Sequence, residues 1–407
     1  MNFVFISPNF PVRYFKWVES LKNRGVNVLG IGDSPYEDCH PRLLSSLKEY
    51  YFVKDLSNFE DMVRAISYFQ TKYGHIDYIE SDNEWWLSLD ARLREHFHVD
   101  TGFYPSDMLK IKAKSEMKQY FNMGGAKTMR YILVDGINDL DKALVFAKEV
   151  DYPVFVKPNI GVGASDSFKL NNEEEVRKFL SSKLEETYIM EEYVDGFIVS
   201  FDGICDSNSN VVFATTDHFM TPIAEVVNEN EDYYYYNNPF SLPFFDIDKE
   251  KFLEVGKGVV KAFGIKKRVF HIEFFVLNKD KEGLAKKGEF VALECNMRPA
   301  GGYTPDLIDY ANSVSLYDIY ADVICYDENK EDMNKTKYYA FASARRDGAN
   351  YVHSESEILS TYKNQLCMHG RYPANLARAM GDLFYYAKFT SFEEGKKFDT
   401  FVRQRNK

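Results

Sequence analysis

The stretch from Phe290 to Asp309, which reads FVALECNMRPAGGYTPDLID, places three different polar side chains at alternate positions. Glu294, Asn296 and Arg298 would share one face of a strand, because successive strand side chains point to opposite faces. Burying a carboxylate, an amide and a guanidinium together costs free energy unless something pairs with them, and a metal ion carrying phosphate groups would do so. The alternative interpretation is an ordinary strand end with a solvated salt bridge.

A second strand upstream supplies a further carboxylate. The segment Val269–Leu277 reads VFHIEFFVL and sets Glu273 among apolar neighbours. Mg²⁺ prefers oxygen ligands in octahedral geometry and usually binds one or two carboxylates together with substrate phosphates. The carboxylates of Glu273 and Glu294 and the amide oxygen of Asn296 fit that need, whereas the eight histidines and five cysteines show no zinc-ligand spacing.

A glycine-containing loop follows another apolar strand, Tyr152–Lys157. Lys157 ends this strand, and Gly161 and Gly163 follow in the loop PNIGVGASDS. Such a loop can turn its backbone amides toward a polyphosphate while the lysine offsets the charge. A structural turn of the same composition is the alternative, since a lone glycine loop is weak evidence.

A basic segment, MLKIKAKSEMKQYF, precedes that loop and carries four lysines. Such runs usually form a solvated helix face. We expect one of the four to be functional, because the segment comes before the glycine loop and the acidic strands in a single order. The lysines are Lys110, Lys112, Lys114 and Lys118.

The elements that must position these residues begin with alternating strands and helices. This pattern over residues 1–101 predicts a parallel, doubly wound sheet. No G-x-G-x-x-G turn follows the first strand, so a dinucleotide site is poorly supported there. Glu84 follows the fourth strand, where open parallel sheets bind ligands, and it either faces a substrate or is a helix-start acid favoured by the helix dipole.

Three further units are expected, over residues 102–194, 195–326 and 327–407. The first is read as α+β, the second contains antiparallel strands, and the last is a small α+β unit whose chemistry is uninformative. A loop at Glu229–Pro243 contains four consecutive tyrosines from Tyr233. These either close over an apolar or aromatic substrate or are structural. His218 either reaches the substrate or is structural.

Composition limits the class of protein. The 407 residues exceed one ordinary core, and the net charge of −12 argues against nucleic-acid or anionic-membrane binding. Five scattered cysteines without a C-x-x-C pair suggest free thiols in a reducing compartment, and Cys295 is expected to be a packed core thiol. With neither a signal-peptide pattern nor a membrane-length apolar run, a cytoplasmic protein is expected. The sequence leaves the oligomeric state open, with a homodimer as one option.

The order and residues of these segments resemble those of the ATP-grasp superfamily. The most specific segments are HIEFF and LECNMRPAGG, with support from KSEMK and VKPNIGVGAS. The resemblance covers roughly Lys114–Ile324 and is closest to carboxylate-amine ligases, including L-amino-acid ligases, and more distant from biotin carboxylase. It implies a mixed α/β and α+β fold. A Rossmann-like N-terminal domain would be followed by a two-lobed ATP-grasp fold, with a small lobe and a large metal-binding lobe, and by a C-terminal subdomain that packs on the large lobe.

The resemblance also implies roles for individual residues. The phosphates of ATP would contact Lys114, Lys157 and the glycine loop. Two Mg²⁺ ions, or Mn²⁺ in their place, would bind the acidic strands. Arg298 and Lys157 would act in catalysis. Ile198 stands where many members have a ribose-binding glutamate, and Asp202 is the candidate substitute. The implied contacts are ATP: Lys114, Lys157, Gly161, Gly163, Ser165, Glu191, Glu192, Tyr193, Val194 and Asp202; metal: Glu273, Glu294 and Asn296; substrate: Arg298, Gly301, Gly302 and Glu84.

The function implied is an ATP-dependent ligase that joins a small carboxylate to an amine through an acyl phosphate. Two alternatives remain open at this point. One is a carboxylase that phosphorylates bicarbonate with the same ATP site, and the other is a non-catalytic ATP-binding sensor. The stretch does not identify which carboxylate and amine are joined.

Overall fold

The N-terminal unit is a parallel sheet with helices on both faces. The computed structural model describes residues 1–161, 166–182, 184–220, 226, 231–244 and 246–406, and it orders this sheet β3-β2-β1-β4. Every pairing is parallel, which confirms the expected doubly wound arrangement. The elements are β1 (Asn2–Ile6), α1 (Phe15–Asn23), β2 (Asn27–Gly32), α2 (Pro41–Ser46), β3 (Glu49–Phe52), α3 (Phe59–Tyr73), β4 (Tyr78–Glu80) and α4 (Leu87–Phe97).

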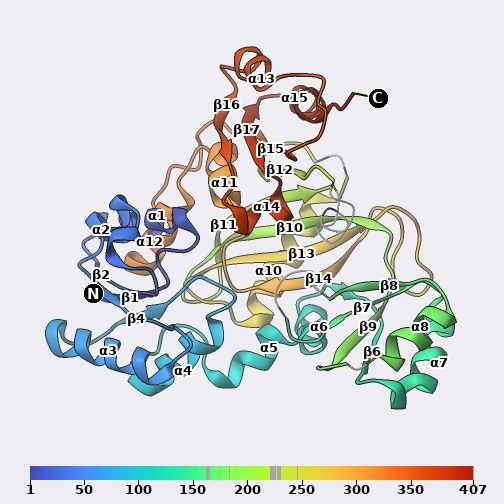
Figure 1. The fold of residues 1–407 in the computed structure, drawn as a ribbon, viewed down its shortest axis with the longest axis horizontal. Coiled ribbons are helices and arrows are strands. Elements are labelled where there is room, and N and C mark those ends of the chain that lie inside the picture. The colour runs from blue at the N-terminus through green and yellow to red at the C-terminus, as the bar shows by residue number, and fades with distance from the viewer. Residues whose placement is uncertain (162–165, 183, 221–225, 227–230, 245, 407) are drawn as a thin grey trace.

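One face of this sheet is covered partly by a helix from far along the chain. Phe3 and Phe5 of β1 pack with Trp17 of α1 and with Tyr317 and Tyr320 of α12 (Leu316–Tyr326). Helices α3 and α4 cover the opposite face. Figure 1 shows α12 beside α1 and α2, on the side of the sheet away from α3 and α4. The N-terminal sheet is therefore buried on both faces, as parallel sheets require.

The second unit is built on a small antiparallel sheet. Its order is β6-β9-β7-β8, and α7 and α8 pack against one face through a core that includes Val154, Val156 and Met190. Phe155 and Lys157 of β7 point to the opposite face. The elements are β6 (Tyr131–Val134), α7 (Leu140–Val150), β7 (Val154–Pro158), β8 (Phe168–Leu170), α8 (Glu173–Ser181) and β9 (Tyr188–Glu192).

The largest sheet has nine strands in the order β16-β17-β15-β12-β11-β10-β13-β14-β5. Its pairings are antiparallel except for β5 with β14. The C-terminal strands extend this same sheet, and α15 covers them (Figure 1). The strands are β5 (Lys127–Thr128), β10 (Gly196–Cys205), β11 (Val211–Phe219), β12 (Tyr234–Asn238), β13 (Arg268–Leu277), β14 (Phe290–Asn296), β15 (Tyr339–Arg345), β16 (Leu366–Arg371) and β17 (Leu383–Phe389).

The expectation of a loop through the four tyrosines is wrong. Tyr234–Asn238 forms β12, which pairs with β11 on one side and β15 on the other, near the middle of the large sheet. Tyr235 and Tyr236 are buried at 1% and 3% exposure. Aromatic residues favour strands, and here pairing on both edges outweighs the acidic residues that precede them.

Helices cover one side of the large sheet, and their contacts show which strand residues face that side. Phe270, Ile272 and Phe274 of β13 point into a core shared with the helices that carry Phe121 and Phe252. The intervening residues of β13 therefore face the other side. The remaining helices are α5 (Met108–Lys112), α6 (Lys114–Met123), α10 (Lys249–Phe263), α11 (Thr304–Asn312), α13 (Glu355–Thr361), α14 (Ala374–Met380) and α15 (Phe392–Arg403).

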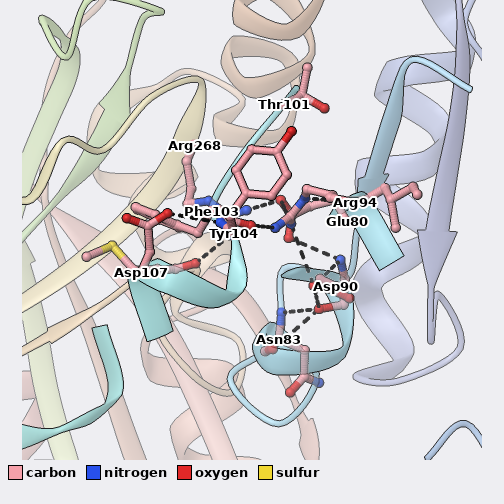
Figure 2. Close-up of polar contacts among 12 residues, drawn as sticks. Glu80, Asn83, Asp90, Arg94, Thr101, Phe103, Tyr104, Asp107 and Arg268 are labelled. Atoms are coloured by element: carbon pink, nitrogen blue, oxygen red, sulfur yellow. Dashed lines mark hydrogen bonds and ion pairs between the residues drawn. The ribbon is translucent and has the colours of Figure 1, made fainter. Parts of the chain in front are cut away.

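A buried charged cluster joins the N-terminal sheet to the large sheet (Figure 2). Arg268, at the start of β13, donates to the carboxylate of Glu80 at the end of β4, and its Nη1 donates to the carbonyl of Met297 at 2.8 Å. Arg94 of α4 also donates to Glu80, at 2.9 Å, and to the carbonyl of Phe103 at 2.7 Å. One carboxylate thus binds two buried guanidiniums from different units. Across the described residues, no helix is both long and apolar enough to cross a membrane.

Candidate active site

A cavity of about 360 Å³ brings together side chains from all parts of the chain. It receives residues from the small sheet, from strands of the large sheet, and from the segments that follow β4 and β14. The cavity is lined by Glu84, Lys114, Phe155, Lys157, Gly161, Ser167, Ile198, Phe219, Tyr233, His271, Glu273, Phe275, Leu293, Glu294, Asn296, Arg298, Ala300, Gly301, Gly302, Thr304, Leu376, Ala379 and Met380.

Pairing of β13 with β14 sets the acidic residues opposite one another. Glu273 faces Glu294, and His271 faces Asn296. The register shifts after Glu273, so Phe274 pairs with Ala292 and Leu293 is an extra residue on β14. Directly opposed residues have Cβ atoms about 4.5–5.5 Å apart, so both carboxylates reach one point on the cavity side.

The donor set fits a hard cation. The Glu273 and Glu294 side chains are 23% and 25% exposed, and both line the cavity with the Asn296 side chain. Within the described part of the chain, no three His, Cys, Asp or Glu side chains form a metal-binding group by themselves. Two carboxylates and an amide oxygen would leave coordination positions for phosphate oxygens and water, as Mg²⁺ sites commonly do.

His271 lines the cavity beside Glu273 and contacts its carboxylate. Its Nε2 lies 3.2 Å from Glu273 Oε1, and its Nδ1 lies 2.6 Å from Asp202 Oδ1. Burial lowers the pKa of His271, but the carboxylates of Asp202 and Glu273 outweigh it and raise the pKa to about 10. Burial raises the pKa of Glu273, and the His271 contact and the charge of Arg298 outweigh it, so the net shift is downward. Glu273 is therefore held as a carboxylate.

Lys114 is the first residue of α6, and its side chain lines the cavity. Its ammonium lies 3.3 Å from Glu294 Oε1 and donates to the Gly161 carbonyl at 3.3 Å. The backbone NH of Lys114 also donates to the Asn159 carbonyl, at 2.9 Å. The start of α6 is thereby fixed to the loop after β7.

Lys157 lies at the end of β7 and is anchored by the buried carboxylate of Glu191. Lys157 Nζ is 2.8 Å from Glu191 Oε2, while Lys118 Nζ is 2.5 Å from Oε1 of the same carboxylate. Burial raises the pKa of Glu191, but the two lysines overcome this and lower it to about 2. Glu191 thus remains ionised and keeps Lys157 extended along the cavity wall.

Arg298 and Glu84 meet across the boundary between units. Arg298 Nε lies 3.6 Å from Glu84 Oε2, and Arg298 Nη1 donates to the Pro299 carbonyl at 2.9 Å. Burial raises the pKa of Glu84, and the nearby Glu294 adds to that effect while Arg298 opposes it. Arg298 therefore has a carboxylate partner and a side facing the cavity.

The cavity gathers most, but not all, of the residues expected from the sequence. Glu191 and Glu192 are occupied by ion pairs, the latter with Arg130 at 2.8 Å, and neither lines the cavity. Tyr193 and Val194 do not line it either, and Asp202 contacts the lining residue His271 without lining the cavity itself. Gly163 and Ser165 fall outside the described residues.

Sequence reasoning missed several residues of this site. His271 is one of them, although its position two residues before Glu273 already places it on the same strand face. Lys118 is one of the four candidate lysines, but its pairing with Glu191 could not be predicted because Glu191 lies far away in the sequence. Phe219 and the apolar residues of α14 also line the cavity, but no local sequence pattern predicts this, since the two segments are separated by more than 150 residues.

Comparisons with known proteins agree with this architecture. Residues 113–225 match the family model described as the ATP-binding domain of the carbamoyl-phosphate synthase L chain. The chain is 21% identical to an L-arginine-specific L-amino acid ligase of Bacillus subtilis over 332 residues, which cover 78% of this chain and 73% of that protein.

Solved structures share the fold over almost the whole chain. An L-amino acid ligase from Bacillus licheniformis superimposes with a TM-score of 0.72 at 15% identity, covering 98% of this chain and 95% of the other. An N5-carboxyaminoimidazole synthetase from Staphylococcus aureus complexed with ADP gives a TM-score of 0.68 at 16% identity, covering 99% and 96%. The expected fold class is confirmed, because these solved structures share the fold of the chain over nearly its whole length.

Proposed function

We propose that the protein is an ATP-dependent carboxylate-amine ligase that forms an amide or peptide bond and releases ADP and phosphate. The observation that carries this proposal is the opposed pair Glu273 and Glu294, which shares one cavity with Lys114, Lys157 and Arg298. Acidic ligands for a cation and basic groups for phosphates thus surround a single space. The sequence relative that is an L-amino acid ligase supports this reaction class.

In the proposed reaction, an oxygen of the carboxylate substrate attacks the γ-phosphorus of ATP. The bond from that phosphorus to the β,γ-bridging oxygen breaks, so ADP leaves and an acyl phosphate forms. The nitrogen of the amine substrate then attacks the acyl carbon and loses a proton, and inorganic phosphate leaves with the electron pair of the broken C–O bond. The protein mainly positions and neutralises the reacting groups.

The residues of the cavity fit these steps. Lys114 and Lys157 would bind phosphate oxygens of ATP. Arg298 would bind the phosphoryl group as it passes from ATP to the carboxylate substrate. Glu273, Glu294 and Asn296 would hold two Mg²⁺ ions, or Mn²⁺ in their place, which when bound neutralise charge on the phosphate oxygens. The backbones of Gly301 and Gly302 would lie along the carboxylate substrate.

Incubation with MgATP and a panel of carboxylates and amines tests the proposal. We expect ADP and phosphate to appear in equal amounts only when both substrates are present, with an amide detected by mass spectrometry. Phosphate release that requires bicarbonate instead would favour a carboxylase. Binding of ATP without phosphate release under any condition would exclude a ligase and favour a nucleotide sensor.

A further inference from the structure

One end of the cavity is an apolar wall made by three separate segments. Phe219 ends β11, Tyr233 precedes β12, and Leu376, Ala379 and Met380 belong to α14. The rings of Phe219 and Tyr233 lie parallel, with centroids 6.5 Å apart. We call these five side chains the apolar wall.

The apolar wall adjoins the segment that follows Arg298. Gly302 adopts a φ of +63°, and a Cβ at this position would overlap Sδ of Met380. The Met380 side chain therefore packs directly on the glycine backbone that would lie along the carboxylate substrate. Thr304, which also lines the cavity, donates from its hydroxyl to the Gly301 carbonyl at 2.8 Å and fixes the same turn.

The charged lining residues of the described structure come from other segments, and each already has a partner. Lys114 pairs with Glu294, Lys157 with Glu191, and Arg298 with Glu84. The carboxylate of Glu273 contacts His271. No described side chain of the apolar wall bears a charge, and its one polar atom is the hydroxyl of Tyr233.

We propose that the carboxylate substrate carries an uncharged, apolar side chain that packs on the apolar wall. This inference rests on the proposed ligase function and adds the substrate class. Burial of an apolar side chain there removes apolar surface of both partners from water. A guanidinium or ammonium placed there would lose its hydration, and among the described side chains of the apolar wall it would find one hydroxyl, which cannot satisfy its several donors. The wall thus selects against the kind of side chain that the arginine-specific relative is named for.

Pairs of amino acids with similar shape test the inference. Phosphate release is measured with leucine against asparagine and with methionine against glutamine and lysine, each as the carboxylate substrate with a fixed amine. We expect kcat/KM to be roughly tenfold or more higher for leucine and methionine than for their polar counterparts. Equal values, or a preference for lysine, arginine or a polar residue, would overturn the inference and leave the ligase function standing.

A variant locates the discrimination on α14. Ala379→Asp places a carboxylate on the apolar wall, so kcat/KM for leucine should fall at least tenfold relative to lysine while the KM for ATP stays unchanged. Ala374→Asp makes the same change on the same helix at an exposed position outside the cavity lining and should leave the ratio unaltered. Met380→Leu, which keeps the wall apolar, should retain the preference. Identical substrate ratios for both aspartate variants would remove α14 from the substrate site.

Failure of the ligase function itself would look different. In that case no amino acid in the panel would promote phosphate release, although ATP would still protect the protein against thermal unfolding. That result would overturn both proposals together. A changed substrate preference with intact turnover would overturn only the apolar one.

Discussion

Glu294 contacts both kinds of charge that the proposed reaction requires. Its carboxylate lies 3.3 Å from the Lys114 ammonium and opposite Glu273 on the neighbouring strand. Glu294→Gln keeps the shape of the side chain but removes the negative charge from the proposed cation site. Removing a side chain that supports a metal ligand typically costs roughly 10- to 100-fold in activity. Because Glu294 is itself a proposed ligand, we expect kcat to fall by at least that factor. Steady-state phosphate release measures this change.

A matched substitution separates this effect from a general loss of structure. Glu289→Gln removes a carboxylate just before β14, where Glu289 pairs with Lys127 at 2.8 Å and neither residue lines the cavity. Such a surface pair contributes about 0–1 kcal/mol, so Glu289→Gln should unfold in urea much like the parent protein and keep its activity. Full activity of Glu294→Gln would remove Glu294 from the metal site.

His271 gives a second prediction, on metal affinity rather than on turnover. His271→Asn removes the ring that spans Asp202 and Glu273, and the Glu273 carboxylate loses its fixed orientation. The Kd for Mn²⁺ in the presence of ADP, measured by electron paramagnetic resonance, should rise roughly 10- to 100-fold. His75→Asn, at an exposed position, is the control. An unchanged Kd would show that His271 does not position the ligand.

The difference between these two residues shows what the sequence reveals at the residue level. Glu273 and Glu294 could be predicted because a carboxylate on an apolar strand needs an explanation. His271 could not be assigned, since its role depends on Asp202 of β10, which reaches it only through pairing of β10 with β13. A residue's type is local information, whereas its partner is set by the register of the sheet.

At the level of elements, strands with a strong periodic pattern were predictable and their irregularities were not. Alternation in β13 places Glu273 and Phe275 on the cavity side, as expected. The extra residue Leu293 in β14 arises from a register shift between two strands and also faces the cavity. The sequence predicts a loop where β12 forms, because the stability of this strand depends on two neighbours, β11 and β15, one of which is distant in sequence.

Helix α6 is positioned by a close approach of two glycines. A Cβ on Gly258 of α10 would overlap the carbonyl oxygen of Gly124, and a Cβ on Gly124 would lie 2.6 Å from Cα of Val259. The end of α6 therefore rests directly on the backbone of α10. This contact fixes the helix whose first residue, Lys114, enters the cavity.

Gly258→Ala tests this contact. Alanine in place of glycine within a helix normally stabilises it by about 1 kcal/mol, but overpacking costs roughly 1–3 kcal/mol. We expect a net decrease in the free energy of unfolding in urea and a higher KM for ATP as Lys114 moves. Lys257→Ala, on the exposed side of the same helix, should leave both unchanged. A more stable Gly258→Ala variant would rule out the tight contact.

At the scale of the whole molecule, the N-terminal sheet depends on the rest of the chain. Its parallel strands follow from the alternating pattern, but no sequence pattern indicates that α12 covers one face or that Arg268 binds Glu80. These contacts join residues more than 180 positions apart. The unit that supplies Glu84 to the cavity is thus held by packing that no local pattern encodes.

Asp82 lies in this contact region, two residues before Glu84. It is fully buried directly after β4, and its backbone carbonyl accepts a hydrogen bond from the Tyr14 hydroxyl at 2.7 Å. Burial raises the pKa of Asp82 from 3.8 to about 7, although Tyr320 and Arg94 oppose the shift. The folded state therefore keeps its proton at a pH where the unfolded chain has lost it. The resulting stabilisation is complete below about pH 4 and is lost as the pH rises through about 7.

Asp82→Asn should remove this pH dependence, because an amide of the same shape does not ionise. Between pH 5 and pH 7 the parent protein should lose up to about 1.4 kcal/mol per pH unit relative to the variant, as measured by urea denaturation across that range. Asp55→Asn is the matched control, because hydrogen bonds from Ser57 lower the pKa of Asp55, and its contribution to stability changes only in acid. Parallel stability curves for the parent protein and Asp82→Asn would show that Asp82 is already ionised in the folded state at pH 5.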